Sequence, residues 1–341
     1  CSATGNGGAI YVDGGASALI SGKLKLDSTY SQCNITDCSA QYGGGLFANG
    51  DVVVQHATIS SNSATKSGGG IFANNNSSLI IGVDSNILNN TINVASGGGN
   101  TEKYYGAGVY AKGQLYIFGA TISGNNFSST TNTFGGGLYT ENISFEIINT
   151  SFQGNNAGEG GAIFSTGGVV DLQDCNFIGN IVGSEAKTNN TVKLSNCYAN
   201  IYKCKFENIS SNEEASAIVL DGGSCIMQNC LFDNNSFAGS KDTNKGTVYS
   251  TGVLLEMAGC SFTDNGTNGV LSNLYYNNNK GSARLVDCSF TNGNASGNEN
   301  SVTIITPNVW VENCTFDNNK DGGLLLQVKY GVVANCYFYA N

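Results

Sequence analysis

The hydrophobic pattern of the chain repeats a short motif in which a small residue is followed two positions later by a large apolar one. A period of two residues is that of a β-strand, in which alternate side chains point to opposite faces. The residue between the two is polar in most copies, as in Cys175-Asn176-Phe177. No segment of useful length has helical periodicity, so the pattern predicts an all-β protein built from short strands.

The motif can be placed twelve times, and its copies are 22 to 35 residues apart. The small residues, termed anchors here, are Cys33, Ala57, Ser85, Ala120, Thr150, Cys175, Cys204, Cys230, Cys260, Cys288, Cys314 and Cys336. The large apolar residues are Ile35, Ile59, Ile87, Ile122, Phe152, Phe177, Phe206, Phe232, Phe262, Phe290, Phe316 and Phe338. A repeat of this length indicates a solenoid, and the variable spacing indicates loops that grow from one of its faces.

A glycine corner precedes another short apolar strand in the first half of the chain, as at Gly135-Gly136-Gly137-Leu138. Such glycines indicate positive φ angles or a close approach of two backbones. The strands are too short and too evenly spaced for crossover helices, so each coil must lie parallel and in register on the one before. We therefore predict a single-stranded parallel β-helix of about 12–13 coils.

In-register stacking turns each inward position into a ladder with a spacing of about 4.8 Å. We expect small residues to stack on small residues at the anchors, and aromatic rings on aromatic rings two positions later. Asparagine recurs five positions after most anchors, where it suits a left-handed corner and a side-chain hydrogen bond to the next coil. These residues are Asn62, Asn90, Asn125, Asn155, Asn180, Asn235, Asn265, Asn319 and Asn341.

The two halves of the repeat differ, although a repeat that runs from end to end predicts one continuous domain over residues 1–341. Coils 1–161 carry the glycine corner, whereas every anchor in coils 162–341 is cysteine. Neither end has a helix, proline or charge cluster that would block strand addition. We expect adjoining β-helix to continue the stack, either as part of a longer chain or as copies that meet end to end in a filament.

Two tetrapeptide signatures in this repeat resemble those of the polymorphic outer-membrane-protein repeat family, GGA[ILV] and FxxN. The first is present as Gly7-Gly8-Ala9-Ile10 and Gly160-Gly161-Ala162-Ile163. The second begins at Phe152, Phe177, Phe232, Phe262, Phe316 and Phe338. The resemblance covers nearly the whole chain and implies a right-handed β-helix displayed at a cell surface, acting in adhesion or as a structural layer.

Charge and hydropathy remove several classes of partner. The net charge is −10, with 15 Lys and Arg in no cluster, which argues against nucleic acid and anionic membrane surfaces. The apolar runs are far shorter than the roughly 20 residues that a membrane-spanning helix needs.

Glycosylation sequons are frequent, which is compatible with an extracellular, glycosylated protein. They begin at Asn34, Asn75, Asn76, Asn89, Asn126, Asn142, Asn149, Asn189, Asn208, Asn234, Asn265, Asn294 and Asn313. Because the chain is rich in Asn, Ser and Thr, many of these arise by chance, and the sequence does not say which are occupied.

The cysteines have three interpretations: disulfides, metal ligands or buried packing. Collinear thiols cannot form a tetrahedral site and no CxxC pair exists, so we expect no metal and no cofactor. Parallel Cβ vectors along a ladder fit a disulfide poorly, so small buried hydrophobes are the favoured interpretation for most of them. The better disulfide candidates are Cys33 with Cys38, and Cys197 or Cys225 with a neighbour.

Carboxylates on the outer face of adjacent coils are the groups from which a polysaccharide-active enzyme would build its site. Glu207 and Asp233 hold the same outward position in successive coils and are the candidate pair. Scattered solvated carboxylates explain them better, and we expect His56, which precedes an anchor, to be a lone exposed histidine. A sugar-binding patch would use exposed tyrosines, of which the candidates are Tyr104, Tyr105, Tyr110, Tyr116, Tyr275, Tyr276, Tyr337 and Tyr339.

The sequence therefore favours a non-catalytic, extracellular structural or adhesive protein, glycosylated and part of a cell-surface filament, stalk or layer. Its expected partners are itself or adjoining β-helix end to end, with glycans or a host or neighbouring cell surface as further ones. The alternatives are a polysaccharide lyase or hydrolase on the same fold and a glycan-binding module.

Overall fold

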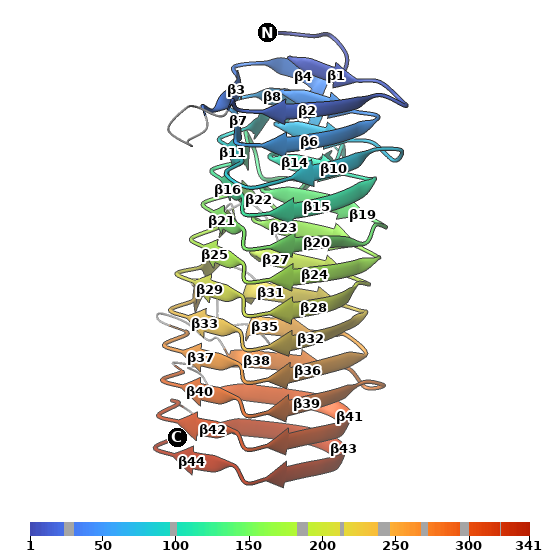
Figure 1. Cartoon of the computed structure of the whole chain (residues 1–341). Helices are drawn as coiled ribbons and strands as arrows, with labels where there is room; N and C mark the ends of the chain where they lie inside the picture. Colours follow the sequence, from blue (N-terminus) through green and yellow to red (C-terminus); the bar gives the residue numbers. More distant parts are fainter. Residues whose placement is uncertain are drawn as a thin grey trace. The chain divides into compact units, whose positions relative to one another are not determined.

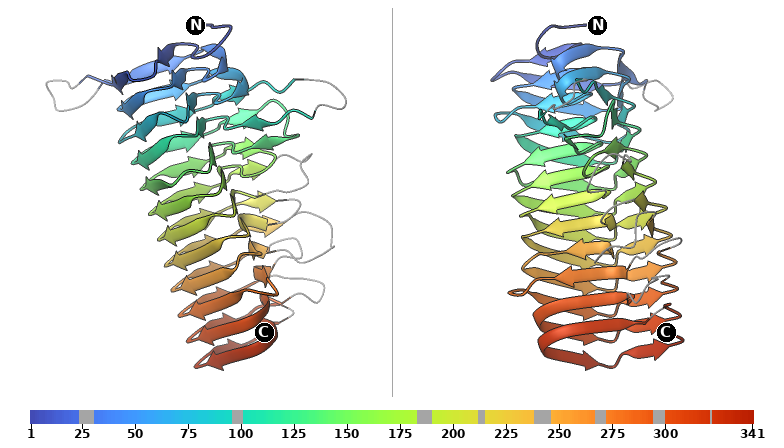
Figure 2. Two further views of the ribbon diagram at one scale, coloured as in Figure 1. Left: turned by 90° about the vertical axis from the view of Figure 1, so that its right-hand side faces the viewer. Right: turned by 180° about the vertical axis from the view of Figure 1, so that it is seen from behind.

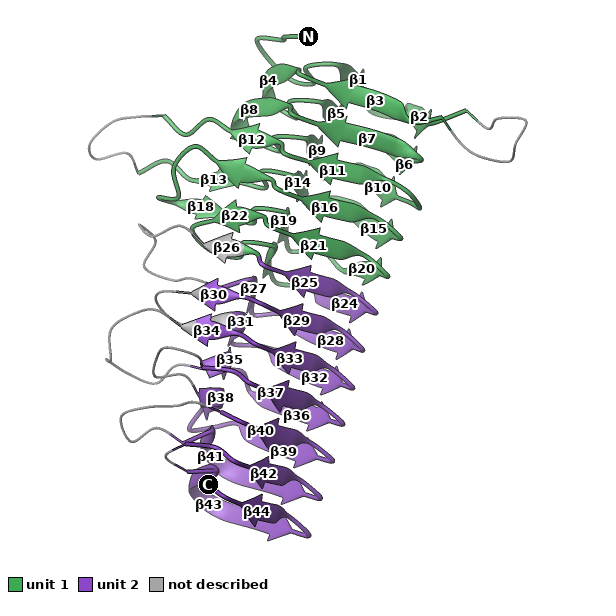
Figure 3. Ribbon diagram, turned by 90° about the vertical axis from the view of Figure 1, so that its left-hand side faces the viewer, with its two compact units in different colours: residues 1–168, 180–186 green, residues 169–179, 187–341 purple. Residues whose placement is uncertain are grey.

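The computed structural model describes residues 1–23, 31–95, 101–182, 190–211, 215–237, 246–266, 272–293, 300–320 and 322–341. All regular structure within them is β-strand, and the paired strands are parallel, which confirms the predicted parallel β-solenoid (Figure 1). The chain divides into two compact units, unit 1 of residues 1–168 with 180–186 and unit 2 of residues 169–179 with 187–341 (Figure 3). The division lies close to the point where the anchors become cysteine.

Each coil of unit 1 runs from a glycine corner through successive short strands to the next corner. The strands after the corner are β1 (Ile10–Val12), β5 (Leu46–Ala48), β9 (Ile71–Ala73), β14 (Val109–Ala111), β19 (Leu138–Glu141) and β23 (Ile163–Thr166). The strands that follow are β2 (Ser17–Ser21), β6 (Asp51–Gln55), β10 (Ser78–Ile81), β15 (Gln114–Phe118) and β20 (Phe145–Ile148).

The motif strands of unit 1 carry the alternation that the sequence shows. They are β3 (Cys33–Thr36), β7 (Ala57–Ser60), β11 (Asn86–Leu88), β16 (Thr121–Ser123) and β21 (Ser151–Gln153). The shortest strands complete the coil: β4 (Ser39–Tyr42), β8 (Ser63–Ser67), β12 (Thr91–Ile92), β13 (Tyr104–Tyr105), β17 (Asn126–Phe127), β18 (Thr133–Phe134), β22 (Asn156–Ala157) and β26 (Ile181–Val182).

Unit 2 stacks its strands in the same way, as the two further views in Figure 2 show. Its motif strands are β25 (Asn176–Ile178), β29 (Lys205–Glu207), β33 (Leu231–Asp233), β37 (Ser261–Thr263), β40 (Ser289–Thr291), β42 (Thr315–Asp317) and β44 (Tyr337–Tyr339). The strands that precede them are β24 (Val169–Gln173), β28 (Tyr198–Tyr202), β32 (Ser224–Gln228), β36 (Leu254–Ala258) and β39 (Ser282–Val286). The others are β27 (Val192–Ser195), β30 (Ser210–Ser211), β31 (Ala215–Asp221), β34 (Ser236–Phe237), β35 (Gly246–Ser250) and β38 (Ser272–Asn277).

The glycine corner has a clear physical basis in unit 1 and is dispensable in unit 2. Gly68 has a φ of +64°, and a Cβ on Gly69 would collide with the carbonyl oxygen of Ala107 in the next coil. In unit 2 two strands merge into one at β41 (Val302–Glu312) and β43 (Leu324–Ala334). β41 pairs with both β38 and β39, so one continuous strand replaces two strands and the turn between them.

The core consists of the predicted ladders. In unit 2 the rings of Phe177, Phe206, Phe232, Phe262, Phe290, Phe316 and Phe338 stack in sequence with centroid separations of 4.4 to 5.2 Å. All but Phe338 are fully buried. Burial of each such side chain contributes on the order of 1.5–3 kcal/mol to stability. The aromatic ladder therefore forms as predicted and is a principal stabilising element of unit 2.

The asparagine ladder lies inside the coil, not at the corner itself. Asn90 donates one Nδ2 hydrogen bond to Asn125 Oδ1 (3.0 Å) and another to the Ile59 carbonyl (2.9 Å). Its backbone N–H also donates to Asn125 Oδ1 (3.0 Å). The left-handed residue is the one before it, Asn89, with a φ of 52°. The predicted contact between coils is thus confirmed, and the predicted left-handed conformation of the ladder asparagine is wrong.

Left-handed residues occur in a regular pattern around the motif strands. The residue four positions after every anchor has positive φ, whether it is Asn, Asp, Ser, Ala or Gly, as at Asp37, Ser61 and Gly124. The residue before the anchor also has positive φ in all copies except the first. Two such residues turn the chain at both ends of a three- to four-residue strand, which is why the motif tolerates so little variation in length.

Replacement of a ladder asparagine tests this arrangement. We expect Asn125→Ala to lower the free energy of unfolding by about 3 kcal/mol or more, because it leaves several buried backbone and side-chain groups without partners. Urea denaturation followed by circular dichroism measures the change. Asn126→Ala, which removes the exposed neighbouring asparagine, is the matched control and should change stability by less than about 0.5 kcal/mol. Equal effects of the two variants would contradict the ladder.

Candidate functional site

A groove of about 730 Å³ lies on the outer face of unit 2, over β36, β39, β41 and β43. Its side chains stand in two columns, because consecutive coils pair in register. One column is Glu256, Arg284, Trp310 and Val332, and the other is Leu254, Ser282, Asn308 and Tyr330. Neighbouring members of a column are about 4.8 Å apart along the sheet.

Two aromatic side chains are presented on the groove. Trp310, the single tryptophan of the chain, is 42% exposed, and its Nε1–H donates to Glu312 Oε2 at 3.0 Å. Glu312 is the next outward residue of the same strand, so the indole is held from within β41. Tyr330 is 63% exposed, and Lys329 Nζ lies 5.1 Å from its ring centroid. Exposed aromatic rings that are fixed by neighbours offer flat apolar surfaces for a ligand.

Charged groups of both signs flank these rings. Arg284, the single arginine, is exposed, and Glu256 beside it in register is half-buried. Within the described residues no ion pair involves either group. Arg284 therefore keeps its five N–H donors available to a ligand. Glu256 and Glu312 offset the charges of Arg284 and Lys329, so the groove is close to neutral in a chain of charge −10.

This groove was not predicted from the sequence, although the strand register contains a signal for it. Glu256, Arg284, Trp310 and Val332 each lie four residues before an anchor, namely Cys260, Cys288, Cys314 and Cys336. Alignment on the anchors alone would have placed the only arginine next to the only tryptophan. Outward positions carry no hydrophobic pattern, however, so nothing in the periodicity drew attention to them.

The predicted carboxylate pair is brought together. Glu207 of β29 and Asp233 of β33 are Cα partners in adjacent coils, and both are half-buried. Lys205 lies two residues before Glu207 and on the same face of β29. These three groups are on the sheet formed by the motif strands, whereas Arg284 is on β39, in the sheet that contains β36 and β41.

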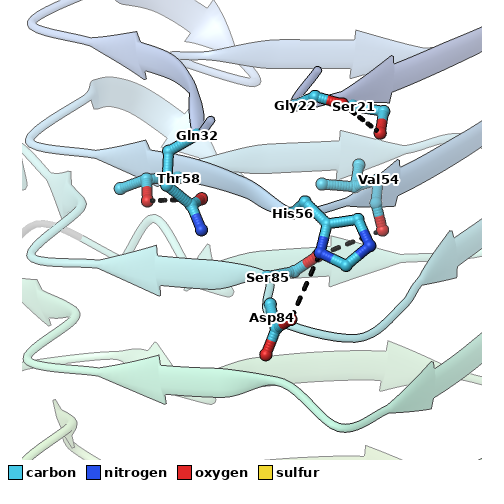
Figure 4. Close-up of polar contacts among 8 residues, drawn as sticks. All are labelled: Ser21, Gly22, Gln32, Val54, His56, Thr58, Asp84 and Ser85. Atoms are coloured by element: carbon cyan, nitrogen blue, oxygen red, sulfur yellow. Dashed lines mark hydrogen bonds and ion pairs between the residues drawn. The ribbon is translucent and has the colours of Figure 1, made fainter. Parts of the chain in front are cut away.

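His56 is not the lone exposed histidine that we expected. Its side chain is only 12% exposed, and Nδ1 lies 3.2 Å from Asp84 Oδ2 (Figure 4). Both residues directly precede an anchor, and both have left-handed backbones, so stacking of the coils brings them together. The predicted exposure of the His56 side chain is therefore wrong, because the next coil covers its ring.

The tyrosines form less of an exposed row than the sugar-binding hypothesis requires. Tyr104, Tyr110, Tyr275 and Tyr276 are buried, and only Tyr337 and Tyr339 of the candidates are well exposed. In unit 1 the outward side chains after the glycine corner cover one another as a ladder of Phe47, Phe72, Tyr110, Tyr139 and Phe164. Burial, together with the charge of Glu141, raises the pKa of Tyr110 well above its usual range.

Most described sequon asparagines are exposed, and one is not. Asn34, Asn75, Asn76, Asn89, Asn126, Asn142, Asn149, Asn208, Asn234 and Asn313 are exposed. Asn265 is fully buried in the ladder and donates to the Phe232 carbonyl at 3.0 Å. It cannot carry a glycan in the folded chain, so that candidate is wrong. Asn189 and Asn294 lie outside the described residues.

All twelve cysteines are free thiols in this structure, so the expected disulfides of Cys33, Cys38, Cys197 and Cys225 are not formed. Cys33 begins β3 and Cys38 lies beyond its end. An extended strand rises roughly 3.3 Å per residue, so Cys33 and Thr36 are about 10 Å apart before the chain turns at Asp37. A disulfide bridges Cα atoms about 7 Å apart at most. Cys225 faces Ala199 in register, not Cys197.

The ladder cysteines from Cys175 to Cys314 are buried. The thiol of Cys230 and burial raise the pKa of Cys260 to about 12, and the thiol of Cys260 and burial do the same for Cys288. Such thiols stay protonated at neutral pH and are poor nucleophiles. The interpretation of the ladder as small buried hydrophobes fits this environment.

Neither a metal centre nor a membrane helix is found in the part of the chain that the structure describes. No three His, Cys, Asp or Glu side chains there lie close enough together to hold a metal ion. No helix in that part has the length and apolar character needed to cross a bilayer.

Comparison with known proteins finds no match to this chain among family models, curated proteins or solved structures.

The buried thiols predict a loss of stability at alkaline pH. A thiol whose pKa is raised in the folded state leaves stability intact below the unfolded value of about 8.5, and stability falls as the pH rises toward about 12. We expect each of Cys260 and Cys288 to contribute about 2 kcal/mol to the fall in unfolding free energy between about pH 8 and 10.

Urea denaturation at the two pH values measures this fall. The double variant Cys260→Ala/Cys288→Ala uses the residue that unit 1 has at anchors Ala57 and Ala120, and its fall should be smaller by about 2–4 kcal/mol. Cys1→Ala removes an exposed thiol and is the control. An unchanged fall in the double variant would contradict the assignment.

Proposed function

We propose that this protein is a non-catalytic, extracellular structural or adhesive β-solenoid that is glycosylated and forms part of a cell-surface filament, stalk or layer. The observation that carries the proposal is the stack of parallel coils, whose corners present exposed sequon asparagines. At β43 and β44 the ladder residues of unit 2 also match those that another β-solenoid coil would continue.

β43 and β44 each have backbone hydrogen-bonding groups on one side that no described strand pairs with. Among the described pairings, β43 pairs only with β41, and β44 pairs only with β42. A parallel strand with one unpaired side offers a row of N–H and C=O groups to a further strand. β43 has eleven residues, which makes this row long.

The ladders also continue to this edge. Phe338 stacks on Phe316 at 4.8 Å and is 49% exposed on its other side. Asn341 Oδ1 accepts from Asn319 Nδ2 at 2.8 Å, as ladder asparagines do in the interior. A coil with an apolar residue and an asparagine at these positions would extend both ladders, whether it belongs to another copy or to adjoining chain.

The exposed sequons support an extracellular location. Asn89, Asn142, Asn149, Asn208, Asn234 and Asn313 combine exposure with a left-handed corner position at the end of a short strand. A glycan attached there would project from the corner without displacing the core. Repeated corners of this kind would place glycans at regular intervals on the surface of the stack.

The open edge predicts end-to-end association that a charge can block. We expect purified chains to form filaments visible by negative-stain electron microscopy, and Phe338→Glu to weaken association by about 100-fold or more. The reason is that the variant would bury an unpaired carboxylate at the junction. Sedimentation over a range of protein concentrations measures the change.

The matched control is Tyr337→Glu, which places the same charge one residue earlier on the outward face of β44. It should assemble like the original chain, and both variants should keep the original circular dichroism spectrum. Monomers at every concentration of the unaltered protein would overturn the filament proposal.

A polysaccharide-active enzyme is the second candidate, because Glu207 and Asp233 are brought together in adjacent coils. Under the proposed structural function, the unaltered chain should release no reducing ends or unsaturated products from pectin, alginate or xylan above background. Turnover that the double variant Glu207→Gln/Asp233→Asn abolishes, with its unfolding curve unchanged, would establish the enzyme instead.

A further inference from the structure

The groove over β36, β39, β41 and β43 is a candidate binding site for the ligand of the proposed adhesive function. We infer that it binds an uncharged, linear saccharide chain laid along the stack, with Trp310 and Tyr330 as stacking platforms and Arg284, Glu256 and Asn308 as hydrogen-bonding groups. The inference rests on the proposed function only for its biological setting, and Phe338, the residue that tests filament formation, lies outside the groove.

The two exposed aromatic side chains suit a sugar ring. A sugar ring has apolar C–H faces and polar hydroxyl edges, and it therefore suits a surface on which flat rings stand beside polar groups. Trp310 and Tyr330 lie in adjacent coils and adjacent columns, and both are exposed. The hydrogen bond from Trp310 to Glu312 fixes the indole, which lowers the entropic cost of stacking a ligand on it.

The spacing of the coils suits a repeating ligand. Side chains of one column repeat about every 4.8 Å, which is close to the length of one sugar ring in an extended chain. A saccharide that runs along the stack thus meets Glu256, Arg284 and Trp310 in succession at a matching repeat. A ligand without a regular repeat would not use this register.

The polar groups of the groove can bind sugar hydroxyls. Arg284 is exposed and takes part in no ion pair among the described residues, so its fork of donors can engage hydroxyl oxygens. Glu256 supplies acceptors one coil away, and Asn308 supplies both a donor and an acceptor in the neighbouring column. The groove therefore offers both donors and acceptors to sugar hydroxyls.

Charge selects an uncharged chain. Arg284 and Lys329 are balanced by Glu256 and Glu312 around the groove, and the whole chain carries a charge of −10. A polyanion would be repelled by the overall field, whereas a neutral saccharide meets no such penalty. The same balance argues against an acidic peptide.

The test uses the fluorescence of Trp310, which as the only tryptophan reports on the groove alone. The full chain is titrated with cello-, xylo-, manno- and chito-hexaoses and with the matching monosaccharides. We expect at least one hexaose to change the emission saturably and to bind at least about tenfold more tightly than its monosaccharide. Arg284→Ala and Tyr330→Ala should each weaken that binding about tenfold or more.

Tyr198→Ala is the matched control, because Tyr198 is an equally exposed tyrosine in the same outward column as Tyr330 but on β28, away from the groove. Its affinity should be unchanged. Isothermal calorimetry repeats the measurement independently of fluorescence, with Trp310→Ala expected to lose binding.

Several outcomes would overturn the inference. They are no response to any neutral hexaose, tighter binding of polygalacturonate or of a proline-rich peptide, and an emission change that depends on protein concentration alone, which would identify a second copy as the occupant. Phe338→Glu separates the two proposals, because Phe338 lies outside the groove. Saccharide binding without filaments contradicts only the assembly, and filaments without saccharide binding contradict only this inference.

Discussion

The buried side-chain amide of asparagine is the interaction on which the rest of this structure depends. A chain that turns inside a solenoid must bury backbone groups at each corner, and unpaired groups of this kind are costly. The ladder asparagine serves the coils on both sides, as Asn125 does with the Ile87 carbonyl, the Asn90 backbone and the Asn155 oxygen. Where the asparagine is replaced, the backbone keeps the contact: Ile209 and Gly293 still donate to Asn235 and Asn319 in the following coil. The corner and the register are therefore set by one contact, and the stacked phenylalanine and cysteine columns follow from that register.

A repetitive interior leaves the outward positions free to vary. The same strand that places Val309 and Val311 in the core presents Trp310 on the surface, because successive side chains point to opposite faces. Stacking then makes neighbours of outward residues that are 22 to 35 positions apart in the chain. His56 with Asp84, Glu207 with Asp233, and Arg284 with Trp310 all arise in this way. A surface site in such a fold is formed by outward residues that stack in register in successive coils. In the groove of unit 2, two such columns place aromatic and polar side chains next to each other.

The interior could be predicted from the sequence because its residues recur at a fixed distance from the anchor. Repetition alone identifies inward residues such as Phe232 and Phe262, or Asn90 and Asn125. The local backbone geometry was harder to predict from the sequence. The left-handed residue is Asn89 and not Asn90, because a pattern of residue types does not distinguish a corner from the inward position beside it. The burial of Asn265 and of tyrosines such as Tyr110 and Tyr276 depends on the neighbouring coil, which a local sequence motif does not contain. The same reason explains why the disulfides expected from nearby cysteines are not formed, and why the groove around Trp310 was missed.

The most direct test of this account is amide hydrogen exchange at single-residue resolution, by fragmentation mass spectrometry of the intact protein under native conditions. The backbone N–H groups of Asn62, Asn90 and Asn235 donate to the ladder oxygens of the next coil. If the ladder sets the corners, these amides exchange only through large-scale unfolding, as slowly as those of the motif strands beside them. If they exchange as fast as exposed loop amides while the strands stay protected, the corners open independently of the stack, and the asparagine ladder is not what holds the coils in register.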